Sequence, residues 1–383
     1  MHKYHIAVVT TTRAEYGLLS PFIRRLYGDP DIDLRLIVSG THLSKRHGDT
    51  IAEIEHDGMP IHGKIPILAE GDTPYDISIT MANTIQGFAQ YFRDERPDLL
   101  VISGDRTEML AIACTAMNER IPMAHYSGGE VTEGAVDDCV RHALTKMSYL
   151  HFTSTEIYHR RVIQMGEDPS RVFNVGALGK ENIDHAPLLD KVTICKQTGI
   201  PYDRRYAVVT FHPVTLDSDT AGEQAANLCR AMEKRDDLFF LITKSNADTG
   251  GDKVNHILMN FVEHHDNAGI VDSLGMVRYL SAVKYAAFVL GNSSSGIVEA
   301  PILGIPTVNI GERQKGRIMV ETIVGCEPAA ESIVSAMAEA EHMPHISTSI
   351  YGSGNTSYQM TEILKKVLSS GDINLKKGFY EEK

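Results

Sequence analysis

The sequence contains few cysteines and no long apolar run. Its five cysteines are scattered and include no CxxC pair: Cys114, Cys139, Cys195, Cys229 and Cys326. This pattern excludes a disulfide framework and a zinc ribbon, and it is typical of a reducing compartment. No stretch approaches the roughly 18 apolar residues of a membrane span, and the apolar run at residues 6–10 is too short for a signal peptide. We therefore expect a cytoplasmic protein with no membrane partner.

Basic charge is also scarce. Lys and Arg number 37 against 50 Asp and Glu, so the net charge is −13. This balance argues against broad binding to nucleic acid or to an anionic membrane. It does not argue against a small anionic ligand, which needs only a local pocket of positive potential. The chain is 43% hydrophobic and 23% charged, which is typical of a globular protein, and its 383 residues predict two domains.

Short apolar runs alternate with segments of helical period in two successive series. Runs that are apolar on both faces and are each followed by a helix predict a parallel sheet covered on both sides. The expected strands lie near 6–10, 34–40, 98–104, 122–129, 149–154 and 172–176, then near 206–213, 239–246, 269–273, 286–296 and 306–311. We predict an α/β fold of two Rossmann-like domains facing across a cleft, at 1–180 and 181–355, with helix 356–370 packed on the first domain.

Polar clusters follow several expected strands, where parallel α/β sheets bind ligands. Thr10, Thr11, Thr12 and Arg13 precede a helix whose free N–H groups favour an anion. The same residues also suit an ordinary helix-capping loop. In the Ser103–Arg106 segment, Asp105 suits a helix cap and, beside Arg106, a charged pocket.

The densest cluster is the segment 125–146. It contains seven charged or titratable side chains: His125, Glu130, Glu133, Asp137, Asp138, Arg141 and His142. On the helix predicted there, Asp137 and Arg141 share a face, as do Asp138 and His142. Such pairs are common on solvated surfaces, but acids, bases and glycines at a strand end also suit proton transfer. Because no HExxH-like spacing occurs, we expect no metal.

The second series carries the strongest local pattern, GNSSSGIVEAP at 291–301, and we expect a helix at 297–303. Serine hydroxyls at a helix N-terminus can hold a phosphate, and Glu299 is placed to accept hydrogen bonds from ribose hydroxyls. The loop matches neither a Walker motif nor GxGxxG, which weakens an ATPase or NAD-enzyme interpretation. His212 suits either core packing or a cleft. Arg313, in the basic segment 311–317, suits either anion binding or an ordinary surface loop.

These clusters together carry a resemblance. The set TRAEYG, SGTHL, SGDRTE, HYSGGEVTEGAVDDCVRHALTK, VTFHP, GNSSSGIVEAP and GERQKGR, in this order, resembles the hydrolysing UDP-N-acetylglucosamine 2-epimerases of sialic and legionaminic acid precursor synthesis. The resemblance runs from about residue 5 to about residue 370. It implies the fold of GT-B glycosyltransferases, with the nucleotide held mainly by the C-terminal domain. It also implies no metal, no NAD and a homodimer or homotetramer.

The resemblance also implies roles for individual residues. The loop of Ser293, Ser294, Ser295 and Gly296 is similar to the family's diphosphate cradle, and Glu299 to its ribose partner. Arg13, Arg106 and Arg313 resemble diphosphate contacts, and His42 a substrate contact. His212 resembles the histidine near the phosphates. Asp105, His125, Asp137 and Arg141 match positions that line the sugar pocket.

One position departs from the family pattern. Many relatives carry a carboxylate two residues after the histidine equivalent to His125, where this chain has Ser127. Glu130 is the nearest carboxylate to take over acid–base work at sugar C2, with Asp105 and Asp137 as competitors. The implied reaction is anti elimination of the nucleoside diphosphate to a glycal, followed by hydration.

Several alternatives stay open. A GT-B glycosyltransferase, a non-hydrolysing 2-epimerase and a catalytically silent nucleotide-sugar sensor share the cradle. The substrate is either UDP-GlcNAc or a diacetamido-trideoxy sugar linked to UDP or GDP.

Overall fold

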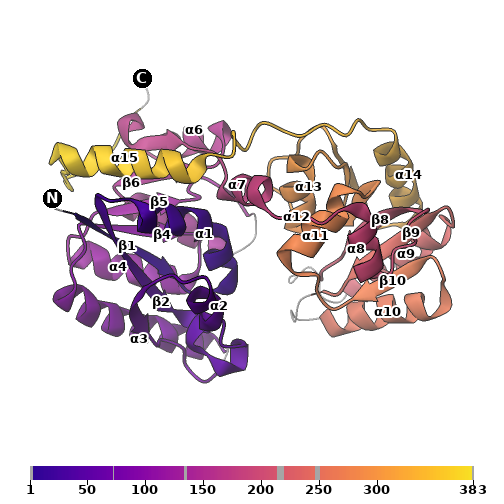
Figure 1. Ribbon diagram of the computed structural model, residues 1–383, viewed down its shortest axis with the longest axis horizontal. Helices are drawn as coiled ribbons and strands as arrows, with labels where there is room; N and C mark the ends of the chain where they lie inside the picture. The colour runs from indigo at the N-terminus through magenta and orange to yellow at the C-terminus, as the bar shows by residue number, and fades with distance from the viewer. Residues whose placement is uncertain (1–2, 72, 133–135, 214–219, 246–250, 382–383) are drawn as a thin grey trace. The chain divides into compact units, whose positions relative to one another are not determined.

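Two compact units make up the chain. The computed structural model describes residues 3–71, 73–132, 136–213, 220–245 and 251–381. Unit 1 comprises residues 1–182 together with 350–383, and unit 2 comprises residues 183–349. Each unit contains one parallel sheet with helices on both faces (Figure 1). The predicted α/β class with two Rossmann-like domains is therefore confirmed.

Unit 1 is built on a seven-stranded sheet of order β3-β2-β1-β4-β5-β6-β7, in which every pairing is parallel. The strands are β1 (Tyr4–Thr10), β2 (Ile32–Ser39), β3 (Ile61–Ile65), β4 (Leu99–Ser103), β5 (Met123–Tyr126), β6 (Leu150–Thr153) and β7 (Val172–Asn174). The central strands are buried along their length, which explains their uninterrupted apolar sequences.

The helices of unit 1 form two layers. They are α1 (Arg13–Gly28), α2 (Ile51–His56), α3 (Pro74–Asp94), α4 (Thr107–Asn118), α5 (Val136–Met147), α6 (Glu156–Gln164), α7 (Leu178–His185, which continues into unit 2) and α15 (Thr356–Ser370), with 3-10 turns at Gly40–Leu43, Lys45–His47 and Pro169–Arg171. Helices α1, α2 and α15 share one apolar cluster with the sheet, and α3, α4 and α5 share another. Met360 and Leu364 of α15 lie in the first cluster, so the carboxyl-terminal helix is part of unit 1.

Unit 2 repeats the plan with a six-stranded parallel sheet of order β10-β9-β8-β11-β12-β13. Its elements are α8 (Lys191–Thr198), β8 (Arg205–Thr210), α9 (Ala221–Glu233), β9 (Leu238–Thr243), α10 (Gly251–His264), β10 (Ala268–Val271), α11 (Gly275–Lys284), β11 (Phe288–Gly291), α12 (Ser294–Ile297), α13 (Glu299–Ile302), β12 (Thr307–Ile310), β13 (Ile323–Cys326) and α14 (Ala330–Glu341). Helices α9, α10 and α14 cover one face, and α8 and α11 cover the other (Figure 1).

One predicted helix is divided into two in the structure, so the prediction of a continuous helix is wrong. The sequence predicts a single helix from Ile297 to Leu303, whereas the structure contains α12 and α13, separated at Val298. Pro301 explains the break, because proline has no N–H to donate to the carbonyl of Ile297 and its ring clashes with that carbonyl. The interruption turns Glu299 into the first residue of a new helix.

Candidate functional site

The predicted polar clusters lie at the carboxyl ends of neighbouring strands. In unit 1, β1 pairs with both β2 and β4, so the strand order reverses there. In unit 2, β8 pairs with both β9 and β11 in the same manner. Such reversal points leave a crevice beyond the strand ends, which is the usual ligand position of open α/β sheets. Each unit therefore places its predicted residues where this fold binds ligands.

Arg141 organises the polar residues of unit 1. Its side chain is only 4% exposed and forms an ion pair with Asp105, from the loop after β4. It also donates to the Glu130 carbonyl at 3.1 Å, to Asp138 Oδ1 at 3.3 Å and to Thr132 Oγ1 at 3.3 Å. A planar guanidinium can serve several acceptors at fixed angles. Arg141 thus brings together the loops that follow β4 and β5.

Asp137 lies in the same charged group. Burial raises the pKa of Asp137 above its ordinary value, and the negative charge of Asp105 raises it further, whereas Arg141 and Arg106 lower it. Arg106 is half exposed and pairs through Nε with the buried carboxylate of Glu108 at 2.7 Å. A carboxyl group with a raised pKa beside arginines is suited to accept and return protons.

Glu15 is a buried carboxyl group that the sequence analysis did not select. Its Oε2 accepts hydrogen bonds from the N–H and the hydroxyl of Thr11, both at 2.7 Å. Its Oε1 is buried without a hydrogen-bond partner and faces Gly104. Burial raises the pKa of Glu15, although the Thr11 bonds and the charge of Arg106 lower it. The position of Glu15 within TRAE, three residues after the capping Thr12, was the available sequence signal.

Two predicted histidines are fully buried. The ring of His125 contacts the Gly104 carbonyl through Nε2 at 3.1 Å and Thr145 Oγ1 through Nδ1 at 3.3 Å. Burial lowers the pKa of His125 to about 3, so its imidazole is neutral. His42 contacts Thr10 and Thr50 through its two ring nitrogens, and burial lowers its pKa as well. In this conformation both rings are engaged inside unit 1.

Two other predicted residues of unit 1, Arg13 and Glu130, are more accessible. The Arg13 side chain is 67% exposed and pairs with Glu53 at 2.8 Å. Glu130 is partly buried, and its Oε1 accepts a hydrogen bond from Ser154 Oγ at 3.1 Å. Glu133 lies outside the described residues. Ser127 adopts a left-handed backbone with φ 73°, which is uncommon for a residue with a side chain.

In unit 2, Asn292 connects the ends of three strands, although the sequence analysis did not select it. Its side chain bonds the backbone N–H and carbonyl of His212, both at 2.8 Å. The main-chain carbonyl of Asn292 accepts hydrogen bonds from Arg313 at 3.1 Å and from Gln314 at 2.8 Å. The His212 ring contacts Ser245 Oγ through Nδ1 at 3.1 Å. The structure therefore brings the predicted residues His212 and Arg313 to one place.

The serine loop, residues 293–296, directly follows Asn292 in the chain. Ser293 caps α12, Ser294 is exposed, and Ser295 bonds the hydroxyl of Tyr279. A Cβ at Gly296 would lie 2.8 Å from Thr307 Cγ2, so close packing requires glycine. Burial raises the pKa of Tyr279 to about 12.

Glu299 lies at the start of α13 and is partly buried. The loss of solvation raises its pKa, whereas its own backbone N–H and the charge of Arg317 lower the pKa in part.

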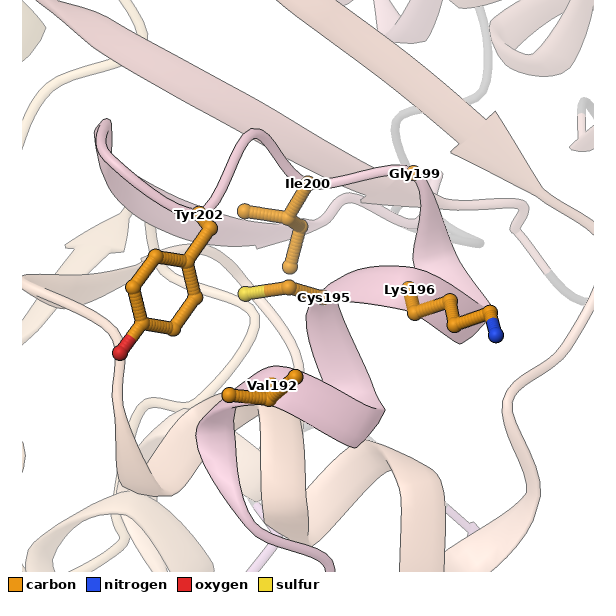
Figure 2. A pocket seen from close by; sticks show the side chains of 6 residues that line it. All are labelled: Val192, Cys195, Lys196, Gly199, Ile200 and Tyr202. Carbon is orange, nitrogen blue, oxygen red and sulfur yellow. The ribbon is translucent and has the colours of Figure 1, made fainter.

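A pocket of unit 2 lies away from these residues. It has a volume of about 420 Å³ and is lined by Val192, Cys195, Lys196, Gly199, Ile200 and Tyr202, from α8 and the turn before β8 (Figure 2). These residues precede the amino end of β8, at the edge of the sheet opposite to His212. No predicted site residue lines this pocket.

Within the described ranges, no group of three His, Cys, Asp or Glu side chains is arranged to hold a metal ion. Over the same ranges, no helix has the length and apolar character needed to cross a bilayer.

Comparison with known proteins decides the family. The model of a family described as UDP-N-acetylglucosamine 2-epimerase matches residues 24–365. The chain belongs to this family. It is 39% identical over 328 residues to the GDP/UDP-N,N'-diacetylbacillosamine 2-epimerase (hydrolyzing) of Campylobacter jejuni, covering 85% of each chain. It is 33% identical over 363 residues to the UDP-N,N'-diacetylbacillosamine 2-epimerase (hydrolyzing) of Legionella pneumophila, covering 94% of this chain and 96% of that one.

Solved structures of the family share the fold. The UDP-GlcNAc 2-epimerase of Neisseria meningitidis bound to UDP-GlcNAc matches with a TM-score of 0.78 at 18% identity, covering 94% of this chain and 100% of that chain. The predicted resemblance to hydrolysing 2-epimerases is confirmed by the family model and by the named relatives. The predicted roles of individual residues stay predictions.

Proposed function

We propose that this 2-epimerase acts on a nucleotide-linked 2,4-diacetamido-2,4,6-trideoxy sugar and releases the free 2-epimer and the nucleoside diphosphate. The proposal rests on one observation above others: relatives at 39% and 33% identity are named for diacetylbacillosamine, whereas the Neisseria relative named for UDP-N-acetylglucosamine is 29% identical. The alternative substrate is UDP-GlcNAc, with N-acetylmannosamine as the product.

Unit 2 supplies the groups that hold the nucleotide. The serine loop at 293–296 offers hydroxyls and helix N–H groups to the diphosphate. Arg313 adds positive charge, and His212 contacts a phosphate oxygen. Glu299 accepts hydrogen bonds from ribose hydroxyls. Charge that builds on the leaving diphosphate is thereby stabilised, which matters because sugar C2–H is a weak acid.

Unit 1 supplies the acid–base groups. A base removes the C2 proton, the C1–oxygen bond breaks, and its electrons leave with the nucleoside diphosphate as the C1–C2 double bond forms. Water then adds at C1, and a proton returns to C2 on the opposite face. We assign these two proton transfers to Glu130 and Asp137. Asp105 is less suited, because its carboxylate is already engaged in the ion pair with Arg141. Arg13 and Arg106 contact the diphosphate.

His125 and His42 receive positioning roles in this proposal. His125 is neutral and holds the Gly104 carbonyl, so it fixes the loop that carries Asp105 and Arg106. His42 connects the end of β1 to Thr50. Neither ring needs to exchange a proton with substrate.

Two experiments test the function. The purified protein is supplied in turn with UDP- and GDP-linked diacetamido-trideoxy sugars and with UDP-GlcNAc, and the products are separated by chromatography. Free sugar with no acceptor present supports hydrolysis, a nucleotide-linked epimer indicates the non-hydrolysing reaction, and turnover only with an acceptor indicates a glycosyltransferase. In deuterated water the freed sugar should carry deuterium at C2, and protium there would exclude the elimination route.

A third experiment tests the acid–base assignment. Glu130→Gln should lower kcat by at least about 100-fold, because general acid–base catalysis contributes at least that much, while UDP affinity is retained. Glu119→Gln, at the end of α4, is the matched control and should turn over normally. Near-wild-type turnover of Glu130→Gln would remove Glu130 from the mechanism.

The predicted cytoplasmic location and homodimer or homotetramer belong to this proposal as well. Light scattering after gel filtration tests the oligomeric state, and a monomer would contradict it.

A further inference from the structure

Asn292 extends the pairing of β8 and β11 beyond the last strand residues. The final backbone pair in this register is Gly291 with Thr210, and the Asn292 N–H donates to the Thr210 carbonyl at 3.2 Å. The Asn292 side chain then accepts from the His212 N–H and donates to the His212 carbonyl, both at 2.8 Å. The side-chain amide of Asn292 thereby makes the two hydrogen bonds to the segment after β8 that the backbone of one further strand residue would otherwise make.

The main chain of Asn292 reaches the third strand. Its carbonyl accepts hydrogen bonds from Arg313 Nη1 and Gln314 Nε2, which both follow β12. Asn292 is only 1% exposed, so these bonds are shielded from water. One residue therefore connects the histidine after β8 with the arginine after β12.

The local backbone explains why this contact forms. Gly291 has φ 140°, and a Cβ there would lie 1.9 Å from the Thr210 carbonyl oxygen. Only glycine permits this close approach of β11 to β8. The next side chain must then offer one acceptor and one donor to His212. Asparagine has both, on two separate atoms, whereas an ionised aspartate has no donor. Serine has one hydroxyl oxygen to serve both backbone groups of His212.

We propose that Asn292 is a positioning residue that holds the backbone of His212 and the guanidinium of Arg313 in one geometry before a nucleotide binds. This inference rests on the proposed function only in assigning the diphosphate to His212 and Arg313. Groups that are ordered in advance cost less to order on binding. Misplacing such groups by about 1 Å lowers turnover by about 100-fold.

The test is a double-mutant cycle with two readouts. UDP affinity by calorimetry and kcat/KM with nucleotide sugar are measured for the wild type, Asn292→Ala, His212→Ala and the double variant. We expect Asn292→Ala to weaken UDP binding about tenfold and to lower kcat/KM by about 100-fold. The side chain that Asn292→Ala removes bonds His212, whereas the bond to Arg313 comes from the main-chain carbonyl, which the variant keeps. The effect of Asn292→Ala in the His212→Ala background should therefore fall below about threefold. A merely structural role predicts the same effect in both backgrounds and would overturn the proposal.

Two further variants keep the test decisive. Asn292→Asp preserves the size and the acceptor but lacks the N–H donor, and it replaces Asn292→Ala if the latter does not fold. Asn267→Ala is the matched control. Asn267, just before β10, donates a hydrogen bond to the carbonyl of Arg235, just before β9, at the amino ends of these strands and away from His212. The control should bind UDP and turn over normally. An equal loss in the control would overturn the proposal.

The two readouts separate this proposal from the proposed function. If the wild type binds UDP but releases no sugar, the proposed function fails, while the coupling in UDP affinity still decides the role of Asn292. If turnover occurs and UDP affinity is unchanged in both Asn292 variants, the positioning role fails alone. If the wild type binds neither UDP nor GDP, both fail.

Discussion

The segment after α15 places Lys377 against a buried carboxylate of unit 1. Lys377 Nζ lies 2.6 Å from Glu167 Oε2, and it donates to the carbonyls of Ser148 at 2.6 Å and Lys146 at 2.9 Å. Glu167 is 1% exposed and also contacts Lys146 Nζ at 2.6 Å and His151 Nε2 at 2.9 Å. Removing Lys377 should therefore destabilise unit 1 and release the C-terminal segment.

The magnitude follows from these contacts. Burial alone would raise the pKa of Glu167, but the bonds from His151, Lys146 and Lys377 lower it from 4.5 to about 2. That decrease corresponds to about 3 kcal/mol at about 1.36 kcal/mol per pKa unit. Burial lowers the pKa of Lys377 itself, so part of this stabilisation offsets the cost of burying its ammonium group, and about 1 kcal/mol remains for Lys377. Its two bonds to backbone carbonyls add about 1–2 kcal/mol together. We therefore expect Lys377→Met to cost about 2–3 kcal/mol.

The assay is equilibrium urea unfolding followed by far-ultraviolet circular dichroism, since the chain has no tryptophan. Lys376→Met is the matched control, because Lys376 is exposed, and it should change the free energy of unfolding by less than about 0.5 kcal/mol. Glu167 has a depressed folded-state pKa, so its contribution is present above about pH 4.5 and is lost as the pH falls toward 2. The difference between wild type and Lys377→Met should shrink over that range.

Two results would refute this reasoning. Equal stability of Lys377→Met and Lys376→Met at pH 7 would show that the buried contacts contribute nothing. A difference that stays constant from pH 7 to pH 3 would show that Lys377 does not act through Glu167.

Three other predictions concern the strand ends. Arg141→Lys should lower kcat/KM by about 100-fold, because a lysine ammonium cannot bond all the acceptors of the Arg141 guanidinium at once. Arg141→Met should also shift the acid limb of the pH–rate profile to higher pH, since Arg141 lowers the pKa of Asp137. An acid limb at the wild-type pH contradicts this. Burial raises the pKa of Glu15, so its ionised form is costly in the folded state at pH 7. Glu15→Gln should therefore keep or raise the melting temperature at pH 7 and should bring no gain at pH 4, where the wild-type carboxyl group is protonated. A lower melting temperature of the variant at pH 7 contradicts this. Gly291→Ala should cost more than about 4 kcal/mol by urea unfolding, because its Cβ would meet the Thr210 carbonyl, and a smaller cost contradicts this.

Much of the fold was predictable because its signals are local. Buried central strands such as β4 are apolar throughout, and each helix after them has a 3.6-residue period. The strand β3 was not predicted, because IHGKI is short, half polar and at the edge of the sheet. The strand β13 was missed for similar reasons, since IVGC is four residues long and also lies at an edge.

The candidate site was predictable in location but not in its contacts. Asp105, Arg141, His212 and the serine loop all follow strands that the sequence predicts, so their place at the carboxyl edge required no tertiary information. The partners of Arg13 and Arg106 were not predictable, because Glu53 is 40 residues from Arg13 and Glu108 suited an ordinary surface position equally well.

The sequence by itself determined which residues stand where a strand meets a helix, because apolar periodicity and helix breakers act over a few neighbouring residues. Only the tertiary structure decided which of these residues become partners. Arg141 meets Asp105 across 36 residues, and Asn292 meets His212 across 80. These pairings depend on the order of strands in each sheet, and that order follows from burying all helices and strands together, which no local pattern encodes.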